Sequence, residues 1–176
     1  AHRWRGNVQR NRATIGGAVV AAAKDDALVA ALLVAGASLT LQAPAGLRQV
    51  ALVDFLHNRT TILAEPAVIT QIVIPLRSAA CALETVARTP TDTPIVLAAA
   101  CAHGTEVRLA LGGVGASVAF YALPGSLAAD AIGPVVDDVV ASLDPAGDFR
   151  GSAEYRRAMA RVLSVRVLTS VMQGAI

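Results

Sequence analysis

Small and apolar side chains fill the chain from residue 18 to residue 34, interrupted only by the polar run Lys24-Asp25-Asp26. Ala, Val and Leu favour helix, and an acidic residue placed before a helix can accept hydrogen bonds from its first turn. The pattern therefore predicts a short helical segment, a polar break, and a helix from about Asp26 to Val34. Gly36 follows at the position where a glycine commonly ends a helix.

The segments that follow have the patterns of strands. Residues 37–43 alternate between apolar and polar side chains, Pro44-Ala45-Gly46 predicts a turn, and residues 48–52 return along the first strand. This arrangement predicts a β-hairpin. Residues 68–74 are rich in β-branched side chains and stop at Pro75, which cannot donate a hydrogen bond to a sheet, so we expect another strand there.

Apolar runs separated by turn-rich pieces dominate the second half of the chain. They cover residues 81–88, 94–102 and 106–111. The economical interpretation is three antiparallel strands. Residues 126–143 and 151–172 carry apolar side chains at helical spacing, so two helices should follow the strands.

Composition narrows the class of protein. The 176 residues are 55% hydrophobic and 16% charged, with a mean hydropathy of +0.56. The longest apolar runs, such as residues 27–35, are far shorter than the ~20 residues that span a bilayer, which excludes a membrane span. A net charge of +2 from scattered basic residues does not favour nucleic-acid binding. The apolar excess suggests that another subunit or a second copy covers part of the surface.

The cysteines and the start of the chain bear on its cellular compartment and on whether it is a fragment. Cys81 and Cys101 lie in apolar stretches without metal-ligand or redox spacing, and we interpret them as small buried hydrophobic residues in a reducing compartment. A disulfide between them is the alternative, although nothing in their spacing requires one. The sequence has no recognisable cleavable leader, so we predict a cytoplasmic protein. It begins at Ala1 rather than Met, which indicates a fragment of a longer protein.

The side chains that usually carry catalysis are few and scattered. His2, His57 and His103 are far apart and show no metal-ligand spacing. Ser117 lacks the glycine two places later that a nucleophile elbow requires. We therefore predict no catalytic residue and no metal site, which leaves binding chemistry.

Residues 11–17, Asn-Arg-Ala-Thr-Ile-Gly-Gly, form the most informative stretch. Glycines allow a ligand to approach the main chain, and successive N–H groups at the start of a helix can hold an anion. The stretch matches neither GxGxxG nor the phosphate-binding loop that ends in lysine, so a plain turn is the alternative. The first twelve residues carry basic side chains and no acidic residue, which suits a pyrophosphate or an acidic partner, or else a solvated terminus: His2, Arg3, Arg5, Arg10 and Arg12.

Six sequence blocks occur in a characteristic order. They are residues 10–17 (RNRATIGG), 28–33, 55–56, 72–75 (IVIP), 109–114 (LALGGV) and 150–157 (RGSAEYRR). In this order the chain resembles the FAD-binding medium subunit of molybdenum hydroxylases, the family that includes carbon monoxide dehydrogenases and xanthine dehydrogenases. The resemblance extends through nearly the whole chain.

The resemblance implies an α+β fold with two parts. Residues 1–77 are similar to the second half of the flavin-binding α/β domain, which has a mainly antiparallel sheet. Residues 78–176 are similar to the C-terminal domain, a three-stranded antiparallel sheet with flanking helices. The strand count taken from the hydrophobic pattern agrees with this domain.

The resemblance also implies FAD as the cofactor, with its pyrophosphate held by two glycine-rich loops. Thr14, Ile15, Gly16 and Gly17 match the second loop, and Asp26 replaces a family carboxylate with a shift of one residue. Two departures weaken the site: Ala18 stands where the family commonly has Asn or Asp, and the first glycine loop has no counterpart in the chain. We therefore expect the fragment to bind FAD weakly.

The implied function is an FAD-binding electron-transfer component of a multisubunit molybdenum-dependent oxidoreductase. Its partners are then a molybdopterin-binding large subunit and an iron-sulfur small subunit, and the fragment alone should be inactive. The alternative is a divergent or truncated relative that has lost the cofactor and serves as a structural or subunit-interaction module, including a homo-oligomer.

Overall fold

The computed structural model describes residues 13–75, 80–90 and 92–174. The predicted basic lead-in before Ala13 and the predicted domain boundary at residues 77–78 lie outside these ranges. In chain order the elements are α2 (Ile15–Ala21), α3 (Ala27–Val34), β1 (Ser38–Ala43), β2 (Gly46–Ala51), α4 (Leu52–His57), α5 (Arg59–Ile62), β3 (Val68–Val73), β4 (Cys81–Val86), β5 (Val96–His103), β6 (Glu106–Gly112), β7 (Ala119–Pro124), η1 (Ala129–Ala131), α6 (Ile132–Ala141) and α7 (Ala153–Gln173).

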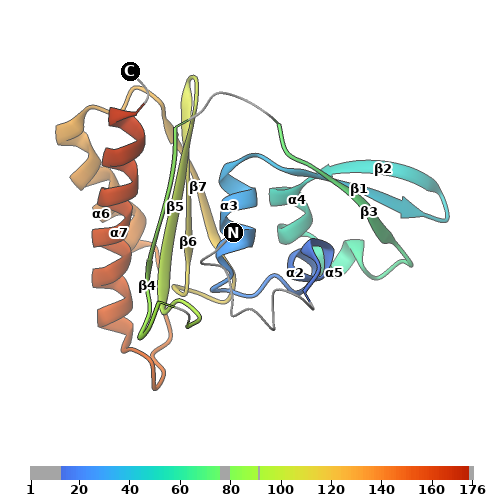
Figure 1. The fold of residues 1–176 in the computed structure, drawn as a ribbon, viewed down its shortest axis with the longest axis horizontal. Helices are drawn as coiled ribbons and strands as arrows, with labels where there is room; N and C mark the ends of the chain where they lie inside the picture. Colours follow the sequence, from blue (N-terminus) through green and yellow to red (C-terminus); the bar gives the residue numbers. More distant parts are fainter. Residues whose placement is uncertain (1–12, 76–79, 91, 175–176) are drawn as a thin grey trace.

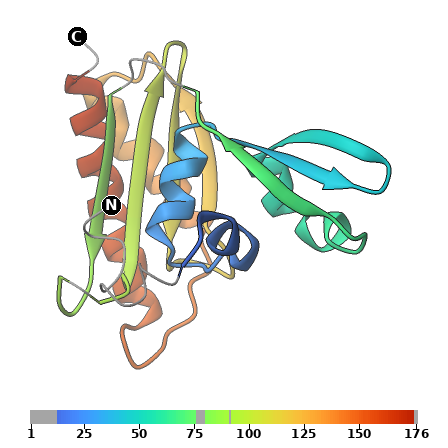
Figure 2. The ribbon, with the colours of Figure 1, turned by 45° about the vertical axis from the view of Figure 1, so that its right-hand side comes forward.

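The strands form two antiparallel sheets, in the orders β2-β1-β3 and β4-β5-β6-β7. Helices α6 and α7 cover one face of the four-stranded sheet, and α3 packs on β5 and β6 from the other side (Figure 1). The three-stranded sheet projects away from this layered body (Figure 2). The arrangement confirms the predicted α+β fold.

Strand β5 lies at the centre of the layered body. Its residues alternate between two apolar clusters: Val96, Ala98 and Ala100 face α6 and α7, whereas Leu97 and Ala99 belong to the cluster around α3 and α4. Because both faces are covered, the strand is a continuous apolar run rather than an alternating one. The first half of the chain therefore completes its core on the sheet of the second half.

The four-stranded sheet corrects the predicted strand count of three. The additional strand β7 pairs with β6, from Glu106↔Pro124 to Leu111↔Ala119. Its residues are mostly half-buried at the sheet edge, so the sequence shows no clear alternation of apolar and polar positions there. Pro124 is tolerated because it ends this edge strand.

The two cysteines correct a second prediction. Cys81 and Cys101 stand directly opposite each other on β4 and β5 and form a disulfide, with their Cα atoms 4.1 Å apart. The interpretation as two separate thiols is wrong, because strand pairing joins residues that are 20 positions apart. Cysteine usage therefore gives no support for a reducing compartment, and the cytoplasmic location stays a prediction.

The helices follow the sequence patterns closely. The polar break after α2, the helix α3, and the end of α3 before Gly36, which has φ +74°, are as predicted. Helix α7 begins after Ser152, as its capping pattern indicates. Among the described residues, no helix is both long and apolar enough to cross a membrane.

Candidate functional site

Helix α2 begins at the predicted glycine loop. The Thr14 hydroxyl accepts a hydrogen bond from the Gly17 N–H at 3.0 Å, and Thr14 itself is extended, with φ −107° and ψ 151°. This is the geometry of a helix N-cap. An added Cβ at Gly17 would lie 2.9 Å from the Thr14 hydroxyl oxygen, so a glycine at this position preserves the cap.

Gly16 has no comparable role in the fold. It lies inside α2 without a positive φ, and an added Cβ would meet no described residue within 4 Å. A glycine in a helix is less favourable than alanine by about 1 kcal/mol. The backbone and its neighbours thus give no reason for glycine here, whereas a ligand that lies against the main chain would give one.

The first turn of α2 offers donors for an anion. As its first two residues, Ile15 and Gly16 have N–H groups without an acceptor within the helix. No hydrogen bond of these two groups is found within the described parts of the chain. The Gly17 N–H, also predicted to face phosphate, is instead taken by Thr14. The residues fit one half of a phosphate grip, built from two main-chain donors, an exposed hydroxyl and the open space at Gly16.

Asp26, the remaining predicted cofactor residue, has a structural role. Its side chain is 4% exposed, and its Oδ1 accepts the Leu28 N–H at 2.9 Å, which caps α3. Its contact to a cofactor stays a prediction. Ala18 is buried in the core side of α2, so the position where the family commonly has Asn or Asp does not face solvent here.

Residues 22–26 connect α2 to α3 and touch the second half of the chain. The Gly113 N–H donates to the Lys24 carbonyl at 2.7 Å. Arg150 donates to Asp25 at 3.0 Å, and both side chains are largely buried. An added Cβ at Gly112 would lie 2.9 Å from the Lys24 oxygen, so the two main chains approach closely. These contacts join the loop region to the RGSAEYRR segment.

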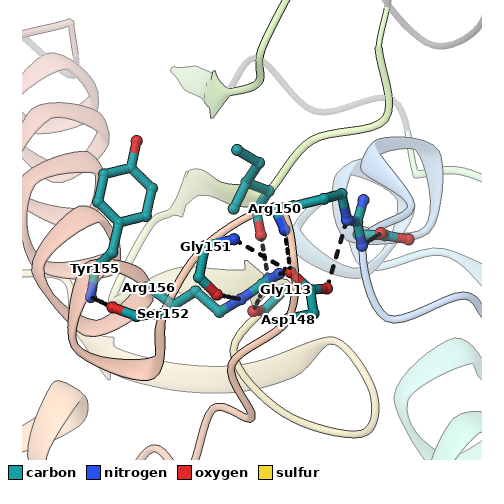
Figure 3. Close-up of polar contacts among 9 residues, drawn as sticks. Gly113, Asp148, Arg150, Gly151, Ser152, Tyr155 and Arg156 are labelled. Carbon is teal, nitrogen blue, oxygen red and sulfur yellow. Dashed lines mark hydrogen bonds and ion pairs between the residues drawn. The ribbon is translucent and has the colours of Figure 1, made fainter.

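A buried arginine holds that segment in place (Figure 3). Arg156 is fully buried and donates to the carbonyls of Ile95 at 2.7 Å and Gly113 at 2.8 Å, and to Asp148 at 2.7 Å. Asp148 also accepts the backbone N–H of Arg150 at 2.8 Å. The arginine therefore links the start of α7 to the residue before β5 and to the turn after β6.

The pKa values of the charged groups reflect these contacts. The hydrogen bond from Arg156 lowers the pKa of the Asp148 carboxyl to about 2, with help from the N–H groups of Arg150 and Gly151. The hydrogen bond to Asp25 raises the pKa of the Arg150 guanidinium. The Asp148 carboxylate therefore acts as a structural anion at neutral pH.

Arg156 is fully buried, so its side chain is not on the surface that a partner subunit would contact. The helical spacing of the sequence is the signal for this burial. Arg156 lies on the same face of α7 as the buried residues Ala160, Leu163 and Val167. Arg157 is 43% exposed at its side chain and lies near Asp144. Within the described residues, no group of three or more His, Cys, Asp or Glu side chains is placed to hold a metal.

Two family models match the chain. Residues 2–77 match the FAD binding domain in molybdopterin dehydrogenase, and residues 81–171, more than half of the 176 residues, match the CO dehydrogenase flavoprotein C-terminal domain. A comparison with curated proteins found no match.

Several solved structures share the fold. A carbon monoxide dehydrogenase from Hydrogenophaga pseudoflava aligns with a TM-score of 0.82 at 23% identity. Quinoline 2-oxidoreductase from Pseudomonas putida 86 aligns with 0.82 at 24%, and the CO dehydrogenase of Oligotropha carboxidovorans with 0.80 at 24%. Each alignment covers 98% of this chain and 65% of the other, so the chain spans about two thirds of the length of these proteins.

The α+β fold agrees with the two family matches. FAD is the cofactor of the domain that residues 2–77 match. The chain belongs to the family of FAD-binding flavoproteins of molybdopterin dehydrogenases and CO dehydrogenase.

Proposed function

We propose that the chain is part of the FAD-binding electron-transfer component of a multisubunit molybdenum-dependent oxidoreductase. The family match supports FAD, and the similar solved structures include a carbon monoxide dehydrogenase and quinoline 2-oxidoreductase. The partners are a molybdopterin-binding large subunit and an iron-sulfur small subunit. Bound FAD would supply the redox chemistry, receiving electrons that come from iron-sulfur clusters and releasing them to an acceptor.

The residues of this chain bind and orient the cofactor rather than react. The Ile15 and Gly16 N–H groups and the Thr14 hydroxyl hold one side of an anionic phosphate group, and the positive end of α2 adds a favourable potential. The absence of a side chain at Gly16 lets the phosphate reach the main chain. Gly16 is the observation that carries the proposal, because no contact among the described residues requires a glycine there.

The test compares two glycines. Gly133 matches Gly16 closely: it is the second residue of α6, and an added Cβ would also meet nothing within 4 Å. Gly16→Ala and Gly133→Ala should each raise the free energy of unfolding by about 0.5–1 kcal/mol, since alanine favours helix. Only Gly16→Ala should weaken FAD binding, by about tenfold or more, because its methyl group occupies the phosphate position.

The measurement is a titration of the purified chain with FAD, followed by quenching of flavin fluorescence. Equal affinity in Gly16→Ala and Gly133→Ala would place the cofactor elsewhere on the chain. If the unmodified chain fails to take up FAD at any concentration reached, the flavoprotein assignment is wrong for this chain, and the cofactor-free structural or interaction module replaces it.

A further inference from the structure

Helix α2, which carries the candidate phosphate loop, has little packing of its own. It has seven residues, of which only Ala18 and Val19 are buried, and Ile15 and Val20 are exposed at 52% and 40%. An element with few buried apolar contacts is easily displaced. Polar contacts near its C-terminal end therefore contribute much to its position.

The connector of residues 22–26 is rigidly attached to α2. The Ala22 N–H donates to the Ala18 carbonyl at 2.9 Å, and Ala22 itself adopts a left-handed conformation with φ 45°. The Asp26 N–H donates to the Ala23 carbonyl at 3.0 Å, and the Asp26 side chain caps α3. A displacement of the connector is therefore transmitted to α2.

The second half of the chain holds this connector at two adjacent points. Lys24 accepts from Gly113, and Asp25 pairs with Arg150, whose side chain is 20% exposed. Arg150 also forms an ion pair with Asp148, in which Arg150 Nε and Asp148 Oδ2 are 3.5 Å apart. Asp148 is in turn held by the buried Arg156, which also binds the Gly113 carbonyl (Figure 3). The two points of attachment share one buried anchor.

We infer that the Asp25–Arg150 ion pair and the Gly113–Lys24 hydrogen bond form a latch, through which the C-terminal part of the chain positions α2 and so sets its affinity for the phosphate group of the cofactor. Arg150 is a positioning residue in this arrangement, since it acts through the connector and not on the cofactor. The inference rests on the proposed function for its effect on FAD, but the positioning of α2 is independent of it.

A second polar contact to α2 comes from within the first half of the chain, and it limits what loss of the latch should do. Arg59 of α5 donates to the carbonyls of Val20 and Ala21 at 3.2 and 2.9 Å. It holds the C-terminal end of the helix but leaves the connector without support. Loss of the latch should therefore loosen α2 without releasing it from the fold.

The test uses Arg150→Met, Asp25→Asn and their combination, with Arg150→Lys as the conservative variant. Arg161→Met is the matched control, because Arg161 pairs with Asp137 at 2.6 Å on an exposed face of α6 and α7, outside the latch. Three quantities are measured: the FAD dissociation constant, amide hydrogen exchange of residues 15–21, and the midpoint of denaturant unfolding.

Arg150→Met and Asp25→Asn should each weaken FAD binding by about fivefold to tenfold, and the double variant should be no worse than either, because both remove the same contact. Exchange in residues 15–21 should rise several-fold in all three and stay near the original rate in Arg150→Lys and Arg161→Met. If the Asp25–Arg150 pair only stabilised the fold, its loss would lower the unfolding midpoint without a selective rise of exchange in residues 15–21.

Unchanged exchange of residues 15–21 in Arg150→Met and Asp25→Asn overturns the latch, whatever happens to FAD. If exchange rises but FAD affinity stays within twofold of the original, the latch positions α2 but does not set affinity, and the inference fails in that part. If the unmodified chain takes up no FAD, the proposed function fails, and hydrogen exchange alone decides the positioning of α2.

Discussion

Helices α2 and α7 begin with the same local geometry. The hydroxyl of the preceding residue, Thr14 or Ser152, accepts the N–H three places later, at 3.0 and 3.2 Å. Beyond the cap they differ. Helix α7 has 21 residues and buries Arg156 in its first turns, whereas α2 has seven residues and leaves its first turn exposed.

The difference lies in where the polar groups find partners. At the start of α7 a buried guanidinium satisfies two carbonyls and a carboxylate of the same chain. At the start of α2, the Ile15 and Gly16 N–H groups find no acceptor within the described residues. A helix start that a buried side chain ties to other parts of the chain is an anchor, whereas the exposed first turn of α2 leaves its main-chain donors accessible to a ligand.

Removal of Arg156, the anchor of α7, should have the largest effect on stability. Arg156→Leu leaves the Ile95 and Gly113 carbonyls without their donor and Asp148 without its partner. Each buried carbonyl left without its donor costs about 1–3 kcal/mol, so the total is a large part of the ~5–15 kcal/mol of a typical domain. The measurement is the denaturant midpoint. Arg161→Leu, which removes an exposed ion pair, should change the midpoint little, and similar losses in both variants would contradict the anchor.

Acid should have the second-largest effect, because it weakens the contact between Arg156 and Asp148. Asp148 has a pKa lowered to about 2, mainly by Arg156, against ~3.9 in an unfolded chain. Its stabilising effect is therefore complete above about pH 4 and is lost as the pH falls towards 2. Asp148→Asn should be less stable than the original chain at pH 7, and the gap should close between pH 4 and pH 2. A gap that stays constant over this range would show that Asp148 does not titrate with unfolding.

The two caps should contribute equally to stability but unequally to binding. Thr14→Ala and Ser152→Ala each remove a side-chain acceptor, which costs about 1 kcal/mol of unfolding free energy. Only Thr14→Ala should also weaken FAD binding, because only its hydroxyl lies beside the candidate phosphate position. Unfolding curves and FAD titrations of both variants check this, and equal FAD affinities would remove Thr14 from the site.

The smallest effect concerns Ala22, the described non-glycine residue with a positive φ. Glycine relieves about 1 kcal/mol of backbone strain there, but it also adds about 0.4–1 kcal/mol of unfolded-state entropy. Ala22→Gly should therefore change stability by less than about 0.5 kcal/mol. Ala128→Gly, at φ −69° and without strain, should be destabilising. Equal losses in both variants would mean that Ala22 carries no strain.

Local patterns were enough to predict α2, α3, the β1–β2 hairpin and helix α7. Each depends on neighbours in sequence: Thr14 with Gly17, Ser152 with Tyr155, and Gly36 after α3. Strand β7 was missed because a half-buried edge strand has a weak hydrophobic alternation.

Long-range partners could not be predicted in the same way. Arg156 contacts residues 61 and 43 positions away, and Arg150 contacts one 125 positions away. Cys81 and Cys101 meet only once the register of β4 and β5 is known. The glycine loop was identified as a candidate site from its composition, but the dependence of its position on the second half of the chain required the fold.

The two main-chain bonds of Gly113 limit which parts of the chain can be exchanged between relatives. Its N–H serves the first half of the chain and its carbonyl serves α7. A chimera joined between residues 77 and 81, where the two family matches meet, would separate Lys24 and Asp25 from their native partners. Functional recombination should therefore require residues 22–26, 112–113 and 148–156 to be inherited from the same parent, although the splice site lies far from all three in sequence.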